Sequence, residues 1–332
     1  MMKKSLIALA VAGTFAAPAF ANTTVSGALR VDAQNVSGIT SEASKGTRVN
    51  NNNSVITVAS SEDIGGGMKA GVSLTFAVGM ADAGSITGQN QFVSLSGGFG
   101  TVRLGAHDSA STVAGRSVDL FGNQSAGDSR TMTSAGASDA RGNDVVLYIS
   151  PSFNGLSVAL AHANMNTSNA ANQGKINMAK VSYANGPLSL AAVSQTRDYA
   201  TDEKDLRVVG SYTMGDTRLV ALYDKIDNVG GTDAADSKTW GVGVAHNMGP
   251  ITLKAQHYAY DLANSDNDAK MTAVGADYSL SKRTKLMAAY SVVTNKGAAT
   301  KGNVMTAANA DTLTIAAGED PKRFSIGVQH TF

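Results

Sequence analysis

Apolar and polar residues alternate with a period of two along most of this chain, which is the pattern of β-strands that have one apolar face. The clearest examples lie in residues 69–78, 206–213, 272–280 and 285–292. No long stretch has helical periodicity, and no segment after the N-terminus approaches the roughly 18 apolar residues of a transmembrane helix. The pattern therefore predicts an all-β protein.

The segments between the alternating runs are of two kinds, which take turns along the chain. The short kind is rich in Gly, Asn, Asp and Pro, which supply the dihedral angles of tight hairpins. Short connections are expected at 62–67, 97–100, 150–155, 185–187, 214–216, 248–250 and 281–283. Long polar connections are expected at 35–53, 80–89, 108–142, 166–174, 198–204, 228–237, 262–268 and 294–321.

These connections separate sixteen strands of about 8–12 residues, the length of a tilted strand that crosses a membrane. Short turns at one end and long loops at the other are typical of outer-membrane barrels. The sequence therefore predicts a 16-stranded antiparallel transmembrane β-barrel with short periplasmic turns and long external loops. A soluble all-β sandwich or a solenoid is the alternative.

Aromatic residues favour the barrel over that alternative, because they share the apolar face and cluster near the strand ends. A barrel places such residues in two girdles at the membrane interfaces, whereas a sandwich core gives no reason for this placement. The expected periplasmic girdle is Tyr148, Tyr183, Tyr212, Tyr278 and Phe332. The expected outer girdle is Phe76, Tyr223, Trp240, Tyr290 and Phe324.

The N-terminus has the pattern of a secretory signal peptide. Lys3 and Lys4 precede a short apolar run over residues 5–17, and residues 19–21 (AFA) form a small-x-small cleavage site. The run is too short for a membrane anchor, which needs about 20 residues. We therefore expect a signal peptide over 1–21, cleavage near Ala21, and a barrel over 22–332.

Composition excludes several classes of protein. The chain has no cysteine, which excludes disulfides, thiolate zinc sites and thiol catalysis. Its formal net charge of +1 would fall to −1 on loss of Lys3 and Lys4, so nucleic acid is not an expected partner. None of the common zinc-protease, hydrolase or P-loop motifs occurs, and the five histidines are dispersed, so no enzyme and no cofactor are predicted.

Several turn-and-strand motifs occur in order along the chain. They are 61–70 (SEDIGGGMKA), 96–105 (SGGFGTVRLG), 150–155 (SPSFNG), 183–188 (YANGPL), 278–284 (YSLSKRT) and 330–332 (HTF). In this order they resemble the Gram-negative general porins, especially those of β-proteobacteria, over the whole chain.

The resemblance implies a passive diffusion channel for ions and small hydrophilic solutes across the Gram-negative outer membrane. It also implies a homotrimer among outer-membrane lipid and lipopolysaccharide. The final strand ends on a C-terminal aromatic, which resembles the signal read by the outer-membrane assembly machinery. The outward residues of that signal would be Val328, His330 and Phe332.

In this family the third external loop folds into the barrel and narrows it. Here that loop is about 108–142, and DLFG at 119–122 resembles an acid-Phe-Gly element of the family with one residue inserted. Asp119 is therefore the best candidate for a constriction carboxylate, and Asp108 and Asp128 lie on the same loop. Arg30 and Arg103 are the candidate opposing cations, because their strands flank the region where the loop folds in.

Strand parity predicts which other charges point into the lumen. Cations exceed acids there, which would set a basic wall against an acidic loop. The candidate lining residues are Lys180, Arg207, Arg218, Lys254 and Asp277, with Asp32, Asp224, Arg197 and Lys285 as further inward charges. Lys69 and Arg323 lie near strand ends, so they are expected at the rim. Leu147 and Ile149 stand where the family often has charges, so the constriction is expected to be more apolar than usual.

Two further hypotheses remain open. The barrel could act as an adhesin or as a phage or host-surface receptor, although no external loop is large enough to be a domain. It could be a substrate-selective channel, although only Tyr258 and Tyr260 are clearly inward aromatics. Asp266-Asn267-Asp268 resembles part of a calcium loop but lacks its Gly and Glu, so no metal site is predicted.

Overall fold

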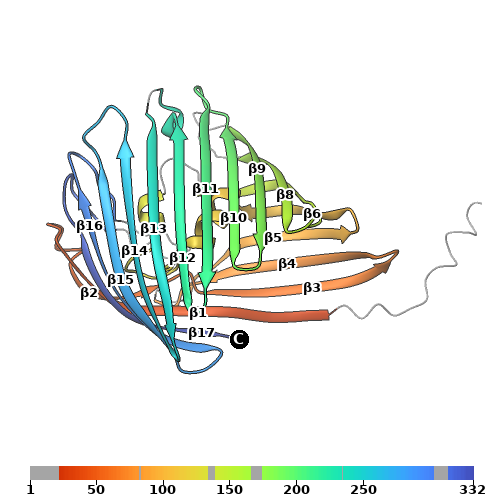
Figure 1. Ribbon diagram of the computed structural model, residues 1–332, viewed down its shortest axis with the longest axis horizontal. Helices are drawn as coiled ribbons and strands as arrows, with labels where there is room; N and C mark the ends of the chain where they lie inside the picture. The colour runs from red at the N-terminus through yellow and green to blue at the C-terminus, as the bar shows by residue number, and fades with distance from the viewer. Residues whose placement is uncertain (1–21, 82–83, 134–138, 166–173, 234, 303–312) are drawn as a thin grey trace, which may run out of the picture.

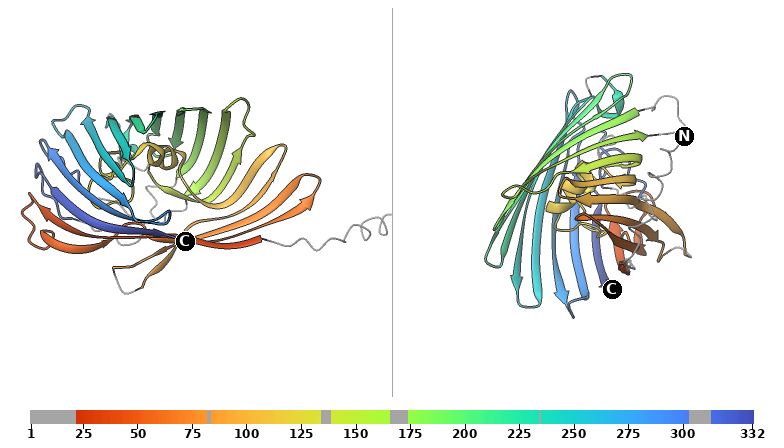
Figure 2. Two further views of the ribbon diagram at one scale, coloured as in Figure 1. Left: turned by 60° about the horizontal axis from the view of Figure 1, so that its bottom comes forward. Right: turned by 90° about the vertical axis from the view of Figure 1, so that its right-hand side faces the viewer.

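The computed structural model describes residues 22–81, 84–133, 139–165, 174–233, 235–302 and 313–332. The expected signal peptide at 1–21 lies outside these residues. One antiparallel sheet contains every strand, and it closes on itself where the last strand pairs with the first (Figures 1 and 2). In the described part of the chain, no helix has both the length and the apolar character needed to cross a bilayer.

The strands follow the chain order around the sheet. They are β1 (Asn22–Ser37), β2 (Gly46–Asn51), β3 (Val55–Gly65), β4 (Met68–Val78), β5 (Ile86–Gly97), β6 (Gly100–Asp108), β7 (Arg141–Ile149), β8 (Leu156–Met165) and β9 (Gly174–Asn185). The remainder are β10 (Leu188–Arg197), β11 (Glu203–Met214), β12 (Thr217–Asp227), β13 (Ser237–Met248), β14 (Ile251–Leu262), β15 (Ala269–Ser279), β16 (Thr284–Asn295) and β17 (Lys322–Thr331). The short helices are α1 (Ala110–Val118), α2 (Arg130–Thr133) and η1 (Val229–Gly231).

The second strand of the barrel is interrupted. β2 pairs with residues 31–36 of β1 and β3 pairs with residues 22–28, so the two segments lie end to end on one side of β1. At the break, Asn52 N–H donates to the Arg30 carbonyl (2.9 Å) and Arg30 N–H donates to Ser54 Oγ (2.8 Å). Counting β2 and β3 as one strand gives the predicted 16-stranded barrel.

The seven short connections join strands where the sequence places them, and glycines supply the left-handed conformation in several. Gly186, Gly215 and Gly249 have φ of 54°, 58° and 60°. The long loops open at the other end of the barrel. The third of them carries α1 and α2 and lies inside the barrel, with α1 against β9–β12 and α2 against β14 and β15 (Figure 2).

The outward face carries the predicted aromatic residues at two levels. Tyr223 stands directly opposite Trp240, and Tyr290 directly opposite Phe324, so the outer girdle runs from strand to strand. At the other end Tyr212 and Tyr278 are exposed near the short turns. Four outward histidines each place Nδ1 2.9 Å from a side-chain oxygen across the strand pair. These contacts are His162–Asn177, His246–Thr217, His257–Thr272 and His330–Thr284.

The seam between β1 and β17 closes the sheet. Gly27 and Phe332 exchange two backbone hydrogen bonds of 3.0 and 3.1 Å, and the Phe332 ring covers Gly27. A Cβ on Gly27 would lie 2.6 Å from the ring and 2.7 Å from the Val55 carbonyl oxygen. Val328, His330 and Phe332 all face outward on this last strand, as predicted from parity, and their role in assembly stays a prediction.

We predict that Gly27→Val weakens the seam by about 1–3 kcal/mol, because the branched side chain must displace the Phe332 ring or the β3 backbone. The measurement is the temperature at which the folded, heat-modifiable form is lost on gels. Val25→Ala, on the same outward face, serves as the control and should leave that temperature nearly unchanged. Equal behaviour of the two variants would contradict the prediction.

Candidate constriction and pore lining

Arg207 fastens the third loop to the barrel wall. Its guanidinium is fully buried and holds both oxygens of Asp224 on β12, with Nε and Nη2 at 2.9 and 2.8 Å. Nη1 donates to the Asp139 carboxylate (2.6 Å) and to the Ser111 carbonyl (2.8 Å). A buried charge is tolerated when it is paired and hydrogen-bonded, and here the pairing joins both ends of the loop to β11 and β12.

Asp139 is the loop's side of this contact. Burial alone would raise the pKa of its carboxyl, but the charge and hydrogen bonds of Arg207, with a hydrogen bond from Thr133, lower that pKa to about 2. Nearby, Ser111 Oγ donates to Asp205 on β11. The carboxylates of Asp205 and Asp139 therefore serve the attachment of the loop.

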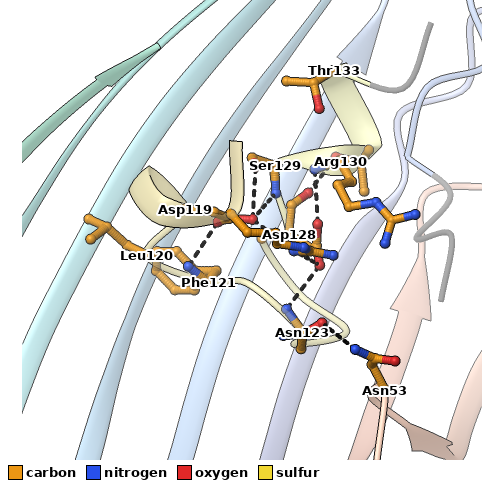
Figure 3. A network of polar contacts seen from close by, with 12 residues as sticks. Asn53, Asp119, Leu120, Phe121, Asn123, Asp128, Ser129, Arg130 and Thr133 are labelled. Carbon is orange, nitrogen blue, oxygen red and sulfur yellow. Dashed lines mark hydrogen bonds and ion pairs between the residues drawn. The ribbon is translucent and has the colours of Figure 1, made fainter. Parts of the chain in front are cut away.

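The middle of the loop is organised around Arg116, which contacts the Asp119 and Asp128 carboxylates; Figure 3 shows these two acids. Arg116 Nη1 contacts Asp128 at 2.7 Å and Asp119 at 3.2 Å. Asp119 also accepts hydrogen bonds from Ser129 N–H (3.0 Å), Ser129 Oγ (2.8 Å) and Gln256 on β14 (3.2 Å). Burial and the neighbouring Asp128 raise the pKa of Asp119. The Asp119 carboxylate thus contacts both the loop and the wall, whereas the Asp128 carboxylate contacts the loop.

The tip of the loop docks where the second strand is interrupted. Ser125 Oγ donates to Asp32 on β1 (2.6 Å) and accepts from Asn50 (2.7 Å). Beside it, Asn53 Nδ2 donates to Asn123 (3.3 Å), which Figure 3 also shows. The short polar side chains at the break therefore act as the receiving surface for the loop.

A cavity of about 350 Å³ remains between the loop and the wall. The charged groups that line it are Asp108, Arg116, Asp119, Arg130, Asp139 and Arg141. The side chains of Asp119, Asp128 and Asp139 are only 0%, 0% and 3% exposed, whereas Arg116 is 20% exposed. Arg141 and Asp108 form a 2.8 Å ion pair with similar exposure. The accessible surface is therefore richer in arginine than in carboxylate.

Arg130 differs from its neighbours. Its backbone N–H donates to Asp128 (2.9 Å), but no ion pair holds its guanidinium within the described residues. In Figure 3 this side chain extends away from the two central carboxylates. Arg130 therefore contributes to the cavity a positive charge that no direct ion pair holds, although Asp128, Asp139 and Asp108 are close enough to act on it.

The predicted constriction residues divide between two places. Asp108 and Asp119 line the cavity, and Asp128 lies behind Arg116. Arg30 borders this region, since its Nη1 donates to the Asn53 carbonyl (2.9 Å). Arg103 instead lines a second cavity together with Lys180.

The remaining predicted lining residues are mostly engaged in contacts. Arg218 donates to the Ser117 carbonyl on the loop. Lys254 pairs with Asp277 at 2.8 Å and lies 4.6 Å from the centre of the Phe121 ring. The expectation of a rim position for Arg323 is wrong: it is 3% exposed and donates to the carbonyls of Ser125 and Gly302. The polar loop tip draws its side chain inward.

Several residues that lie in the lumen were not predicted there from the sequence. Glu203 and Asp205 are inward and buried because β11 begins earlier than its apolar pattern, and extending the parity would have found them. Lys301 lies on the last external loop, 3.9 Å from the Tyr260 ring centre, and burial lowers its pKa to about 8. No sequence signal places that loop residue in the lumen. Among the residues described, no cluster of three or more His, Asp or Glu side chains could hold a metal ion.

Comparisons with known proteins agree with this architecture. A family model described as Gram-negative porin matches residues 8–298. Outer membrane porin protein 32 of Delftia acidovorans is 31% identical, with all of both chains covered. A major outer membrane protein P.IB of Neisseria gonorrhoeae is 28% identical over 86% of this chain and 92% of its own. The solved anion-selective porin from Comamonas acidovorans superposes with a TM-score of 0.80 at 27% identity, covering 94% of this chain and all of that one.

We predict that Arg207→Met releases the third loop, because it leaves the Asp224 and Asp139 carboxylates buried without the guanidinium that pairs with them, at a cost of about 3–5 kcal/mol. The readout is single-channel conductance in KCl, which should rise or become unsteady. Arg218→Met is the matched control, since it removes one contact to a loop carbonyl from a partly exposed side chain. Unchanged, steady conductance in Arg207→Met would contradict this role.

The ion pair between Asp139 and Arg207, which attaches the loop to the wall, should also weaken as the pH falls. The pKa of Asp139 is lowered in the folded protein, so its contribution is complete above the ordinary pKa of about 3.9 and is lost as pH falls towards about 2. Conductance should stay steady down to about pH 4 and fluctuate below about pH 3. Asp139→Asn should lose this transition, whereas a transition that persists unchanged in the variant would assign it to another group.

Proposed function

We propose that the pore of this chain, which belongs to the Gram-negative porin family, prefers anions. The chain is an integral outer-membrane barrel of a family of passive channels for solutes and ions. The observation that supports the preference is the arrangement of charges around the 350 Å³ cavity. Arginine is accessible there, while most carboxylates are covered.

The electrostatic reason is a difference in exposure as well as in number. A permeating ion is desolvated most where the passage is narrow, so charges that it can approach count more than charges behind other side chains. Arg116, Arg130 and Arg141 line the cavity, and Asp108 is its accessible acid. Asp108 and Arg141 neutralise each other in their ion pair, which leaves Arg116 and Arg130 as the remaining accessible charges. A relative of the same fold carries the description anion-selective, which supports this proposal.

We further propose that the protein is a homotrimer that needs the outer-membrane assembly machinery and contacts lipopolysaccharide. The family resemblance supports the trimer, and one related barrel, OmpT of Vibrio cholerae, is described in a trimer form. At 16% identity, the similarity to that barrel is evidence for a shared fold only. We propose no enzymatic role, in keeping with the function of the family.

The test is the reversal potential of single channels under a KCl gradient. In the wild type, we expect the reversal potential to have the sign that corresponds to preferred permeation of chloride over potassium. Arg130→Glu should lower the chloride-to-potassium permeability ratio by about threefold or more, because it reverses an unpaired charge at the cavity. Lys69→Gln, at the exposed start of β4, is the control and should change the ratio little. Cation preference in the wild type would overturn the proposal.

A further inference from the structure

A second cavity of about 150 Å³ lies between α1 and the inner wall made by β6–β9. Its walls are largely apolar. The apolar lining residues are Ala110, Val113, Val145, Leu147, Ile149, Ala159, Ala161 and Met178. Val113 on α1 is 39% exposed although it lies inside the barrel. The alanines of β8 leave the space that larger inward side chains would fill.

Two cations border this apolar surface. Arg103 stands directly opposite Leu147 in the sheet register, and Lys180 directly opposite Ala159. Arg103 lies 4.5 Å from the Phe92 ring centre and contacts His107 Nε2 at 3.1 Å, while its Nε has no hydrogen-bond partner. Lys180 has no hydrogen bond or ion pair to a described residue, so its ammonium is available to a ligand.

One acid also reaches the cavity. Asp108 is held by Arg141 at 2.8 Å and by Asn90 Nδ2 at 2.9 Å, so its carboxylate is already engaged. The uncompensated charge at this cavity is therefore positive. A neutral apolar molecule would form no ion pair with these cations, and a small inorganic anion would leave the apolar wall exposed to water.

We propose that this cavity is a binding site for organic monoanions that have an apolar body, such as aromatic or short aliphatic carboxylates. An aliphatic cavity of about 150 Å³ can hold one benzene ring. The ring would lie on Leu147, Ile149 and Met178, and the carboxylate would face Lys180 and Arg103. The inference rests on the proposed anion-preferring channel and names a class of solute that the channel would retain.

The test compares three probes on the folded trimer in planar bilayers. Sodium benzoate, sodium acetate and neutral benzamide are added to a KCl current, and the concentration that halves the current is measured for each. We expect the value for benzoate to be about tenfold below those for acetate and benzamide, which is about 1.4 kcal/mol for the ring and similarly for the charge.

Variants separate the two parts of the site. Lys180→Gln should raise the benzoate value about fivefold and leave benzamide unchanged. Leu147→Asn, which keeps the branch at Cγ but makes the wall polar, should weaken both benzoate and benzamide. Lys69→Gln removes a cation outside the cavity and should change neither value. If Leu147→Asn does not fold, Lys180→Gln decides the result.

Equal half-blocking concentrations for benzoate and acetate would overturn the inference, as would equal effects of Lys180→Gln and Lys69→Gln. The reversal potential in KCl, recorded before each probe is added, separates the two proposals. Cation preference with retained benzoate block refutes the anion preference alone. Anion preference without selective benzoate block refutes the binding site alone.

Discussion

A sheet that spans a membrane cannot keep a free edge, because the hydrocarbon offers no partner for unpaired backbone N–H and C=O groups. Everything else in this molecule follows from meeting that constraint by closure. β1 pairs with β17 over residues 28–37, and Phe332 completes the seam with Gly27. Closure with sixteen strands makes the barrel too wide for wall side chains to fill, so the lumen needs a separate structure to narrow it.

The third loop narrows the lumen, and apolar packing together with charged groups holds it there. The loop buries apolar side chains against the wall, including Val118, Phe121 and Met132, and its polar contacts with the wall fix where it sits. Arg207 anchors its two ends, Gln256 contacts its middle, and Asp32 receives its tip. These contacts cover most of the loop's carboxylates. The same ion pairs that fix the loop therefore also leave arginine as the accessible charge.

The fold was readable from the sequence because strand parity and turn chemistry are local. The seven tight turns and the inward position of Arg30, Lys180 and Lys254 all follow from counting by two along a strand. The pairing of charges is not local. Asp119 has the right residue type for a constriction carboxylate, but Arg116, Ser129 and Gln256 enclose it, and only the folded loop brings these together. The predicted rim position of Arg323 was wrong for the same reason, because its hydrogen-bond partners are loop carbonyls.

The break in the second strand has a consequence for sequence variation. A continuous strand would present only every second residue to the lumen, whereas the break lets the run Asn50–Asn53 turn several short polar side chains towards the loop tip at once. Neither side can then change alone without leaving a buried amide or hydroxyl unsatisfied. Residues 50–54 and residues 123–125 should therefore co-vary among related sequences, although some seventy residues separate them in the chain.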